Sequence, residues 1–206
     1  LLGGLPASVE AQRKDPIQWS LEAAAGEAPP SAVLPLKLTA KLEPGWHLYS
    51  LTTPEGGPIR TTVRLADNSA LTGWRIFQPK PVSRLDPNFG VETETYEGQQ
   101  VVFLLDAQLA PAAQSPVEII AQVRYQACTD KLCLPPRRKA ASVTVNMAAS
   151  AAAPSRPIPP EYAEVRLAEP APATGARAPV RMGDGQTQGL GGFLLIAFGF
   201  GLAAIF

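Results

Sequence analysis

The chain has 206 residues, enough for one domain of ordinary size with appended segments. Lysine plus arginine and aspartate plus glutamate number 18 each, so the formal net charge is zero. No overall field attracts the chain to nucleic acid, and the sequence has no basic stripe interleaved with aromatic residues. These features exclude the usual nucleic-acid-binding classes.

Residues 1–11 resemble the end of an export signal. Apolar residues are followed by small ones, and Val9-x-Ala11 fits a signal-peptidase site before Gln12. A mildly apolar terminus without a targeting role is the alternative. Export would place the rest of the chain in an oxidising compartment, where disulfides persist.

The next part of the chain carries the patterns of short β-strands. From Leu34 to Leu42, apolar residues alternate with Pro, Lys and Thr, and this period of two predicts a strand with one buried face. Further strands separated by Gly, Pro, Asn and Asp turns are predicted over residues 17–23, 46–51, 61–65, 74–77, 101–105, 117–126 and 141–147. About eight short strands without a convincing amphipathic helix predict an all-β fold, a β-sandwich.

Both cysteines of the chain follow the predicted strand 117–126. Alternate residues from Val117 to Tyr125 share an apolar face, so the alternation predicts that Cys128 points away from that face and lies near a surface. Pro135 and Pro136 then remove two backbone donors, which predicts that Cys133 lies in a loop at the edge or end of the sheet.

Three kinds of site fit a cysteine pair with this spacing. Redox exchange is favoured, because a disulfide closing so short a loop contributes only about 2 kcal/mol in the chain-entropy model. A structural clip on a strand end is common in exported domains and remains open. Two close thiolates also suit a soft metal ion, although a closed zinc site takes four ligands and His47 is the only histidine.

The composition changes sharply near residue 148. Residues 149–188 are rich in Ala, Pro, Gly and Arg and contain few large apolar side chains, which predicts a linker that follows a folded domain over residues 12–148. Residues 189–206 carry no charge and are apolar throughout, which predicts the beginning of a transmembrane helix.

Taken together, these motifs resemble the N-terminal periplasmic domain of the DsbD family of thiol:disulfide interchange proteins. The resemblance rests on Tyr125-Gln-Ala-Cys128, on Cys133-Leu-Pro-Pro136, and on the Ala/Pro linker and Gly-rich apolar end. It implies an immunoglobulin-like β-sandwich and a protein-disulfide reductase that uses its own dithiol without a cofactor. It also implies that Cys133 forms mixed disulfides with partners and that Cys128 resolves them.

The resemblance further implies partners and a location. Electrons would arrive from a thioredoxin-like domain of the same parent protein and pass to periplasmic disulfide isomerases and cytochrome c maturation thioredoxins. The folded domain would lie in the bacterial periplasm, tethered to the inner membrane through the helix that begins at residue 189.

Two more segments resemble parts of that family's active site. Residues 85–91, beginning with Leu85-Asp86, resemble a cap loop with Phe89 as an apolar lid over the sulfurs. Residues 45–49 resemble the aromatic strand beside the site, where Tyr49 would pack near the cysteines. His47 shares the face of Tyr49 by alternation and could tune a thiol pKa. An aromatic residue plugging a turn and an ordinary surface histidine are the alternatives.

A different function fits the same sequence. The chain would then be a non-catalytic, membrane-tethered β-sandwich binding module whose disulfide is structural. The redox potential distinguishes the two functions, since structural bridges in exported proteins lie below about −300 mV and exchanging ones lie higher. Charged residues in and after the cysteine loop, including Asp130, Lys131 and Arg138, are expected to be merely solvated.

Overall fold

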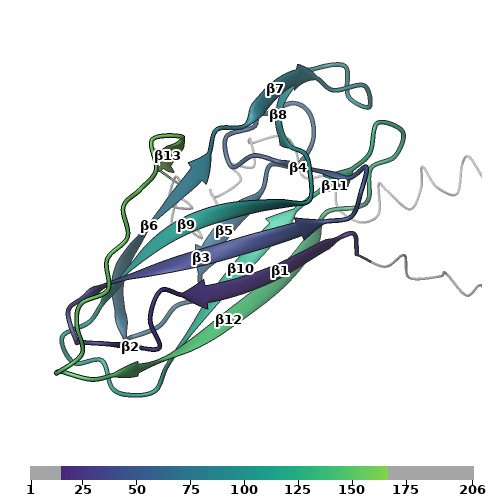
Figure 1. Ribbon diagram of the computed structural model, residues 1–206. Coiled ribbons are helices and arrows are strands. Elements are labelled where there is room, and N and C mark those ends of the chain that lie inside the picture. The colour runs from purple at the N-terminus through teal and green to yellow at the C-terminus, as the bar shows by residue number, and fades with distance from the viewer. Residues whose placement is uncertain (1–14, 167–206) are drawn as a thin grey trace, which may run out of the picture. The chain divides into compact units, whose positions relative to one another are not determined.

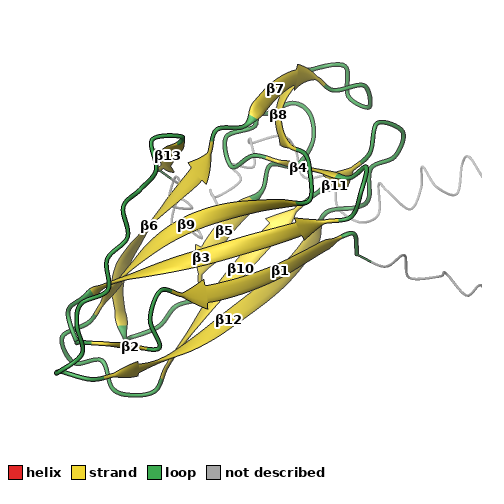
Figure 2. Ribbon diagram, viewed as in Figure 1, coloured by secondary structure: helices red, strands yellow, loops and turns green. Residues whose placement is uncertain are grey.

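The structure is a computed structural model that describes residues 15–166, and this part of the chain contains strands but no helix (Figures 1 and 2). The strands are β1 (Ile17–Ala23), β2 (Glu27–Ala28), β3 (Val33–Leu42), β4 (His47–Tyr49), β5 (Thr62–Leu65), β6 (Leu71–Pro79), β7 (Val82–Leu85), β8 (Glu92–Tyr96), β9 (Gln100–Leu109), β10 (Val117–Tyr125), β11 (Ala127–Cys128), β12 (Arg137–Met147) and β13 (Tyr162–Val165). The all-β prediction is confirmed.

Two sheets enclose the core. One has the strand order β1-β3-β9-β6-β13 and the other the order β2-β12-β10-β5 (Figure 1). Their inward side chains, such as Leu38 and Phe103 from the first sheet and Ile119 and Val123 from the second, belong to one buried apolar cluster. The alternating pattern of β3 and β10 places these side chains inward, and the arrangement agrees with an immunoglobulin-like sandwich.

A third, smaller sheet lies at one end of the sandwich, in the order β11-β4-β8-β7 (Figure 1). β10 leads through a single residue, Gln126, into β11, so one continuous segment leaves the large sheet and enters the small one. The small sheet therefore receives the first cysteine directly from a strand of the core.

The predicted strands all occur, with β1 at its predicted bounds. The sequence patterns missed the hairpin of β7 and β8, whose outward apolar residues Val82 and Leu85 break the usual alternation. They also missed β13, which lies in the segment predicted as linker.

The domain extends beyond its predicted end at residue 148. β13 pairs antiparallel with β6, from Tyr162 opposite Pro79 to Val165 opposite Ile76. The segment that leads to β13 is anchored by Arg156, whose guanidinium donates to the carbonyl of Leu36 at 2.9 Å. The linker prediction is therefore wrong for residues 149–165, because backbone pairing and one partly buried arginine hold this segment despite its small apolar content.

Other predicted segments lie outside the described residues. These are the export-signal remnant 1–11, the rest of the predicted linker up to residue 188, and the predicted membrane helix 189–206. Within residues 15–166, no helix long and apolar enough to cross a membrane is found.

The anchoring role of Arg156 can be tested by Arg156→Ala. Its guanidinium also donates to the Leu105 carbonyl and to Asp106 Oδ1 at 3.0 Å, and its side chain is only 14% exposed. Loss of these charge-assisted bonds should lower the free energy of unfolding by about 2 kcal/mol, as measured by urea denaturation.

Arg75→Ala is the matched control, because Arg75 contacts the other oxygen of the same carboxylate at 3.1 Å but is 56% exposed. It should cost about 1 kcal/mol or less. Equal losses in the two variants would contradict the anchoring role of residues 149–165.

Candidate active site

The two cysteines form a disulfide that closes a short loop at the end of the small sheet. The Cα atoms of Cys128 and Cys133 are 4.1 Å apart. Cys128 lies opposite His47 in the pairing of β11 with β4. The loop is closed by backbone bonds from Thr129 N to Leu132 O at 2.8 Å and from Leu134 N to Ala127 O at 2.9 Å. Backbone hydrogen bonds within the loop and across its base thus fix the positions of the two cysteines.

The two cysteines differ in burial. Cys128 is fully buried, whereas Cys133 remains partly exposed. The prediction that Cys128 lies near a surface is wrong, because the alternation of β10 ends at Tyr125 and Cys128 pairs with a strand of another sheet. A reagent from solvent therefore meets Cys133 first.

The predicted cap loop connects β7 to β8 and has a defined turn at its tip. Asp86 N donates to Val91 O at 2.9 Å, and Gly90 N donates to Asp86 O at 2.7 Å. Gly90 has a φ of 68°, a left-handed conformation that glycine adopts without strain. Asp86 Oδ1 also accepts the backbone N–H of Asn88 at 2.8 Å. The carboxylate of Asp86 therefore organises the loop that it begins.

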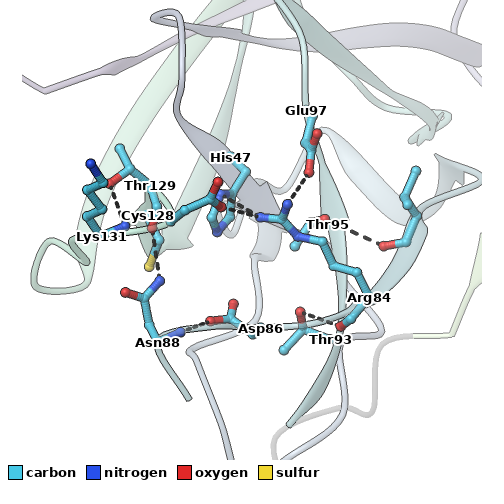
Figure 3. A network of polar contacts seen from close by, with 12 residues as sticks. His47, Arg84, Asp86, Asn88, Thr93, Thr95, Glu97, Cys128, Thr129 and Lys131 are labelled. Carbon is cyan, nitrogen blue, oxygen red and sulfur yellow. Dashed lines mark hydrogen bonds and ion pairs between the residues drawn. The ribbon is translucent and has the colours of Figure 1, made fainter. Parts of the chain in front are cut away.

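The cap loop and the cysteine loop are joined directly (Figure 3). Asn88 Nδ2 donates to the carbonyl of Thr129, the residue after Cys128, at 2.9 Å. Phe89, the predicted lid, lies in the same loop and is 38% exposed. A Cβ atom added at Gly57 would lie 3.9 Å from the Cβ atom of Phe89, so Phe89 lies beside the loop that contains Gly57. The structure thus joins the cap loop to the cysteine loop through Asn88, whereas the role of Phe89 as a lid over the sulfurs stays a prediction.

A series of hydrogen bonds runs from Arg84 through His47 and Tyr49 to Asp86. Figure 3 shows its first link, between Arg84 and His47. Arg84 lies 3.1 Å from His47 Nδ1, and because arginine only donates, Nδ1 must accept. The proton of His47 is then on Nε2, which donates to Tyr49 Oη at 3.2 Å. Tyr49 in turn donates to Asp86 Oδ2 at 2.6 Å. Each of these three bonds thus has a defined donor and a defined acceptor.

The environment fixes the charge of each member. Burial and the nearby positive charge of Arg84 lower the pKa of His47, which is 3% exposed, so the surface-histidine alternative is wrong. Burial and the hydrogen bond to Asp86 raise the pKa of Tyr49. Burial alone would raise the pKa of Asp86, but bonds from Tyr49 and the Asn88 N–H outweigh it and lower that pKa. In this series of hydrogen bonds, His47 is therefore a neutral imidazole, Tyr49 a neutral phenol and Asp86 a carboxylate.

Sequence reasoning missed three residues of this site. Arg84 also pairs with Glu97 at 2.7 Å and with Asp130, between the cysteines, at 3.2 Å. Asp130 is therefore not merely solvated, and Arg84 and Asn88 belong to the site although the sequence patterns give them no role. The available signal was position, since both lie within two residues of Asp86 at the start of the cap motif. Within residues 15–166, no cluster of three or more candidate metal ligands is present.

The bond from Asn88 to Thr129 should slow the reaction of the disulfide. Asn88→Ala removes one side-chain bond between the cap and cysteine loops, worth about 1 kcal/mol, so reduction by dithiothreitol should accelerate about fivefold. Thiol release measured by stopped flow would check this.

Asn68→Ala is the matched control, because Asn68 Nδ2 makes a similar bond to the Glu118 carbonyl, outside the cysteine and cap loops. It should leave the reduction rate unchanged. An unchanged rate in the Asn88 variant would show that this bond does not restrain access to the disulfide.

Stability should fall on mild acidification because of His47. Its pKa in the folded state lies below the unfolded value of about 6.5, so between the two values the unfolded chain binds more protons and stability rises with pH. Urea denaturation should give a lower free energy of unfolding at about pH 5 than at about pH 7. The pKa of Asp86 is lowered, so its contribution is lost only at more acidic pH.

His47→Gln should abolish this dependence, and the control is clean because the chain has no other histidine. If the variant and the original chain showed the same slope between these pH values, the buried neutral imidazole would be refuted.

No curated protein sequence matches the chain. Among solved structures, the N-terminal periplasmic domain of ScsB from Proteus mirabilis has 16% identity and a TM-score of 0.45, over 62% of this chain and 44% of that one. The DsbD N-terminal domain of Neisseria meningitidis in the reduced form has 15% identity and a TM-score of 0.39, over 64% and 86%. The chain thus spans less than half of the ScsB structure.

A family model gives the assignment. The model described as thiol:disulfide interchange protein DsbD, N-terminal, matches residues 18–145. This stretch is more than half of the chain and contains both cysteines, the cap loop and all strands from β3 to β11. The chain therefore belongs to the family of DsbD N-terminal domains, whose members take part in thiol–disulfide exchange.

Proposed function

We propose that this domain is a protein-disulfide reductase that works through Cys128 and Cys133. The observation that carries the proposal is the unequal burial of the two cysteines in one loop, which is hydrogen-bonded to the cap loop. Exchange between proteins needs one sulfur that a partner can reach and a second one close by that resolves the mixed disulfide. Cys133 and Cys128 fit these two roles.

The reaction of the reduced domain has two steps. The thiolate of Cys133 attacks one sulfur of the partner's disulfide, so that a mixed disulfide forms and the partner's other sulfur leaves as a thiolate. The thiolate of Cys128 then attacks the sulfur of Cys133 and releases the partner's first sulfur. Two electrons pass to the partner, and the Cys128–Cys133 disulfide forms. The reverse sequence, with a reduced donor attacking Cys133, recharges the domain.

A docked partner also has apolar contacts available near the cysteines. The exposed large apolar side chains of residues 15–166 are Val33, Val82, Leu85, Phe89 and Leu132. Four of these five lie on β7, on the cap loop or in the cysteine loop. Exposed apolar side chains gathered in one region indicate an interaction site. Docking would replace the bonds of Asn88 and Arg84 to the cysteine loop by contacts to the partner.

The physiological route belongs to the same proposal. Electrons would come from a thioredoxin-like domain of the same parent protein and pass to periplasmic disulfide isomerases and cytochrome c maturation thioredoxins. The domain would lie in the periplasm, tethered to the inner membrane. Support comes from family membership, from the disulfide itself, and from the signal-like and apolar ends of the sequence.

Trapping tests the two cysteine roles. The full chain with Cys128→Ala should form a stable mixed disulfide through Cys133 with a thioredoxin that keeps one active-site cysteine, activated as its thionitrobenzoate disulfide. Cys133 displaces thionitrobenzoate, and neither protein then keeps a resolving thiol. Mass spectrometry of the adduct would identify the joined cysteines.

The chain with Cys133→Ala is the matched control, and its buried Cys128 should react at least about tenfold more slowly. Equal trapping by both variants would contradict the assigned roles. No trapping by either, together with a potential of the unaltered disulfide below about −300 mV, would show that the bridge is structural.

A further inference from the structure

Three arginines gather on the outer face of the β5-β10-β12 sheet. Arg124 of β10 lies directly opposite Arg138 of β12. Arg64 of β5 lies opposite Gln122, two residues before Arg124 on the same face of β10. The opposite face of these strands carries buried residues such as Val63 and Val123, so all three arginines point away from the core. We call Arg64, Arg124 and Arg138 the arginine cluster.

No acidic side chain of residues 15–166 neutralises the arginine cluster, as none forms an ion pair with these three residues. Their neighbours on β12 differ, because Arg137 and Lys139 both lie 3.5 Å from Asp15 Oδ2. The outward acidic residue of β10 is Glu118, which lies six residues before Arg124, a distance of about 20 Å along a strand. The cluster is therefore a local positive field in a chain of zero net charge.

The cluster has an energetic cost in the isolated domain. Side chains directly opposite in an antiparallel pair have Cβ atoms only about 5 Å apart, and like charges there are destabilising. The outward surface around Arg124 and Arg138 forms an open groove of about 600 Å³, which Arg64, Thr62 and Gln122 also line. An anionic occupant of this groove would remove the repulsion.

The cluster lies next to the site of exchange. Arg124 precedes Cys128 by four residues, at most about 13 Å of extended chain, and β12 begins four residues after Cys133. The ends of β10 and β12 thus flank the cysteine loop (Figure 1). A stable protein interface covers about 800 Å² on each partner. A partner of that size seated on Cys133 would reach the arginine cluster.

We propose that the arginine cluster is an electrostatic docking surface for a carboxylate-rich face of the protein that exchanges disulfides with Cys133. This inference rests on the proposed function. Charges at the rim of an interface mainly increase the association rate, and the increase depends on ionic strength. The apolar residues of the cap would then hold the partner, while the cluster would orient it.

The test measures the rate of exchange between the full oxidised chain and a reduced thioredoxin of net negative charge. At about 20 mM salt, Arg124→Gln/Arg138→Gln should lower the second-order rate constant about tenfold, and the difference should largely vanish at about 500 mM salt. The rate with dithiothreitol should change far less, because its attacking thiolate carries a single charge and so small a reagent needs no docking surface. Lys37→Gln/Arg75→Gln is the matched control, because it removes two positive charges from the other large sheet and should keep the original rate.

The remaining outcomes separate this inference from the proposed function. Equal rates for the two variants at low salt would overturn the docking surface while leaving the exchange reaction intact. A chain that dithiothreitol reduces but thioredoxin does not would overturn the exchange function and the docking surface together. If the two variants reacted with thioredoxin at equal rates but the Arg124→Gln/Arg138→Gln variant lost binding to phosphatidylglycerol vesicles, the cluster would bind a membrane surface. That result would overturn the proposal that it binds a protein partner.

Discussion

The site depends on one backbone pairing, that of β11 with β4. This pairing takes the chain out of the large sheet after Tyr125 and places Cys128 in the small sheet, where it is fully buried. Cys133 stays on the outer side of the same loop. The pairing thereby makes two chemically identical thiols unequal in solvent exposure. It also places the cysteine loop within hydrogen-bond distance of the cap loop between β7 and β8.

The hydrogen bonds from Arg84 through His47 and Tyr49 to Asp86 tie the same strand to the cap loop. His47 and Tyr49 come from β4, and Asp86 begins the cap loop. Because Arg84 can only donate, the direction of every bond is set, and an added proton on His47 would break the chain at its first link. The cap is thus held by a few polar contacts rather than by a large buried apolar surface. Under the proposed function, docking would exchange this contact set for contacts to the partner.

The distribution of charge also depends on how the strands are arranged. The chain is neutral overall, so composition alone gives no reason to expect an anionic partner. Folding separates the basic residues of β12 by face: Arg137 and Lys139 lie near Asp15, whereas Arg138 points outward beside Arg124. The period of two along a strand performs this separation, because neighbouring residues point to opposite faces of the sheet. The arginine cluster therefore produces a local positive potential beside the disulfide although the net charge of the chain is zero.

The sequence by itself determined the all-β fold, most of the strands and the family, because alternation and the motif around Cys128 and Cys133 are local patterns. It also indicated the cap loop and the face that His47 and Tyr49 share. Only the tertiary structure decided the burial of Cys128, the chain from Arg84 to Asp86, and the attachment of residues 149–165 to the domain. Each of these depends on pairing between segments far apart in the sequence. Alternation along one strand predicts which face a side chain takes, but it does not predict what another strand places against that face.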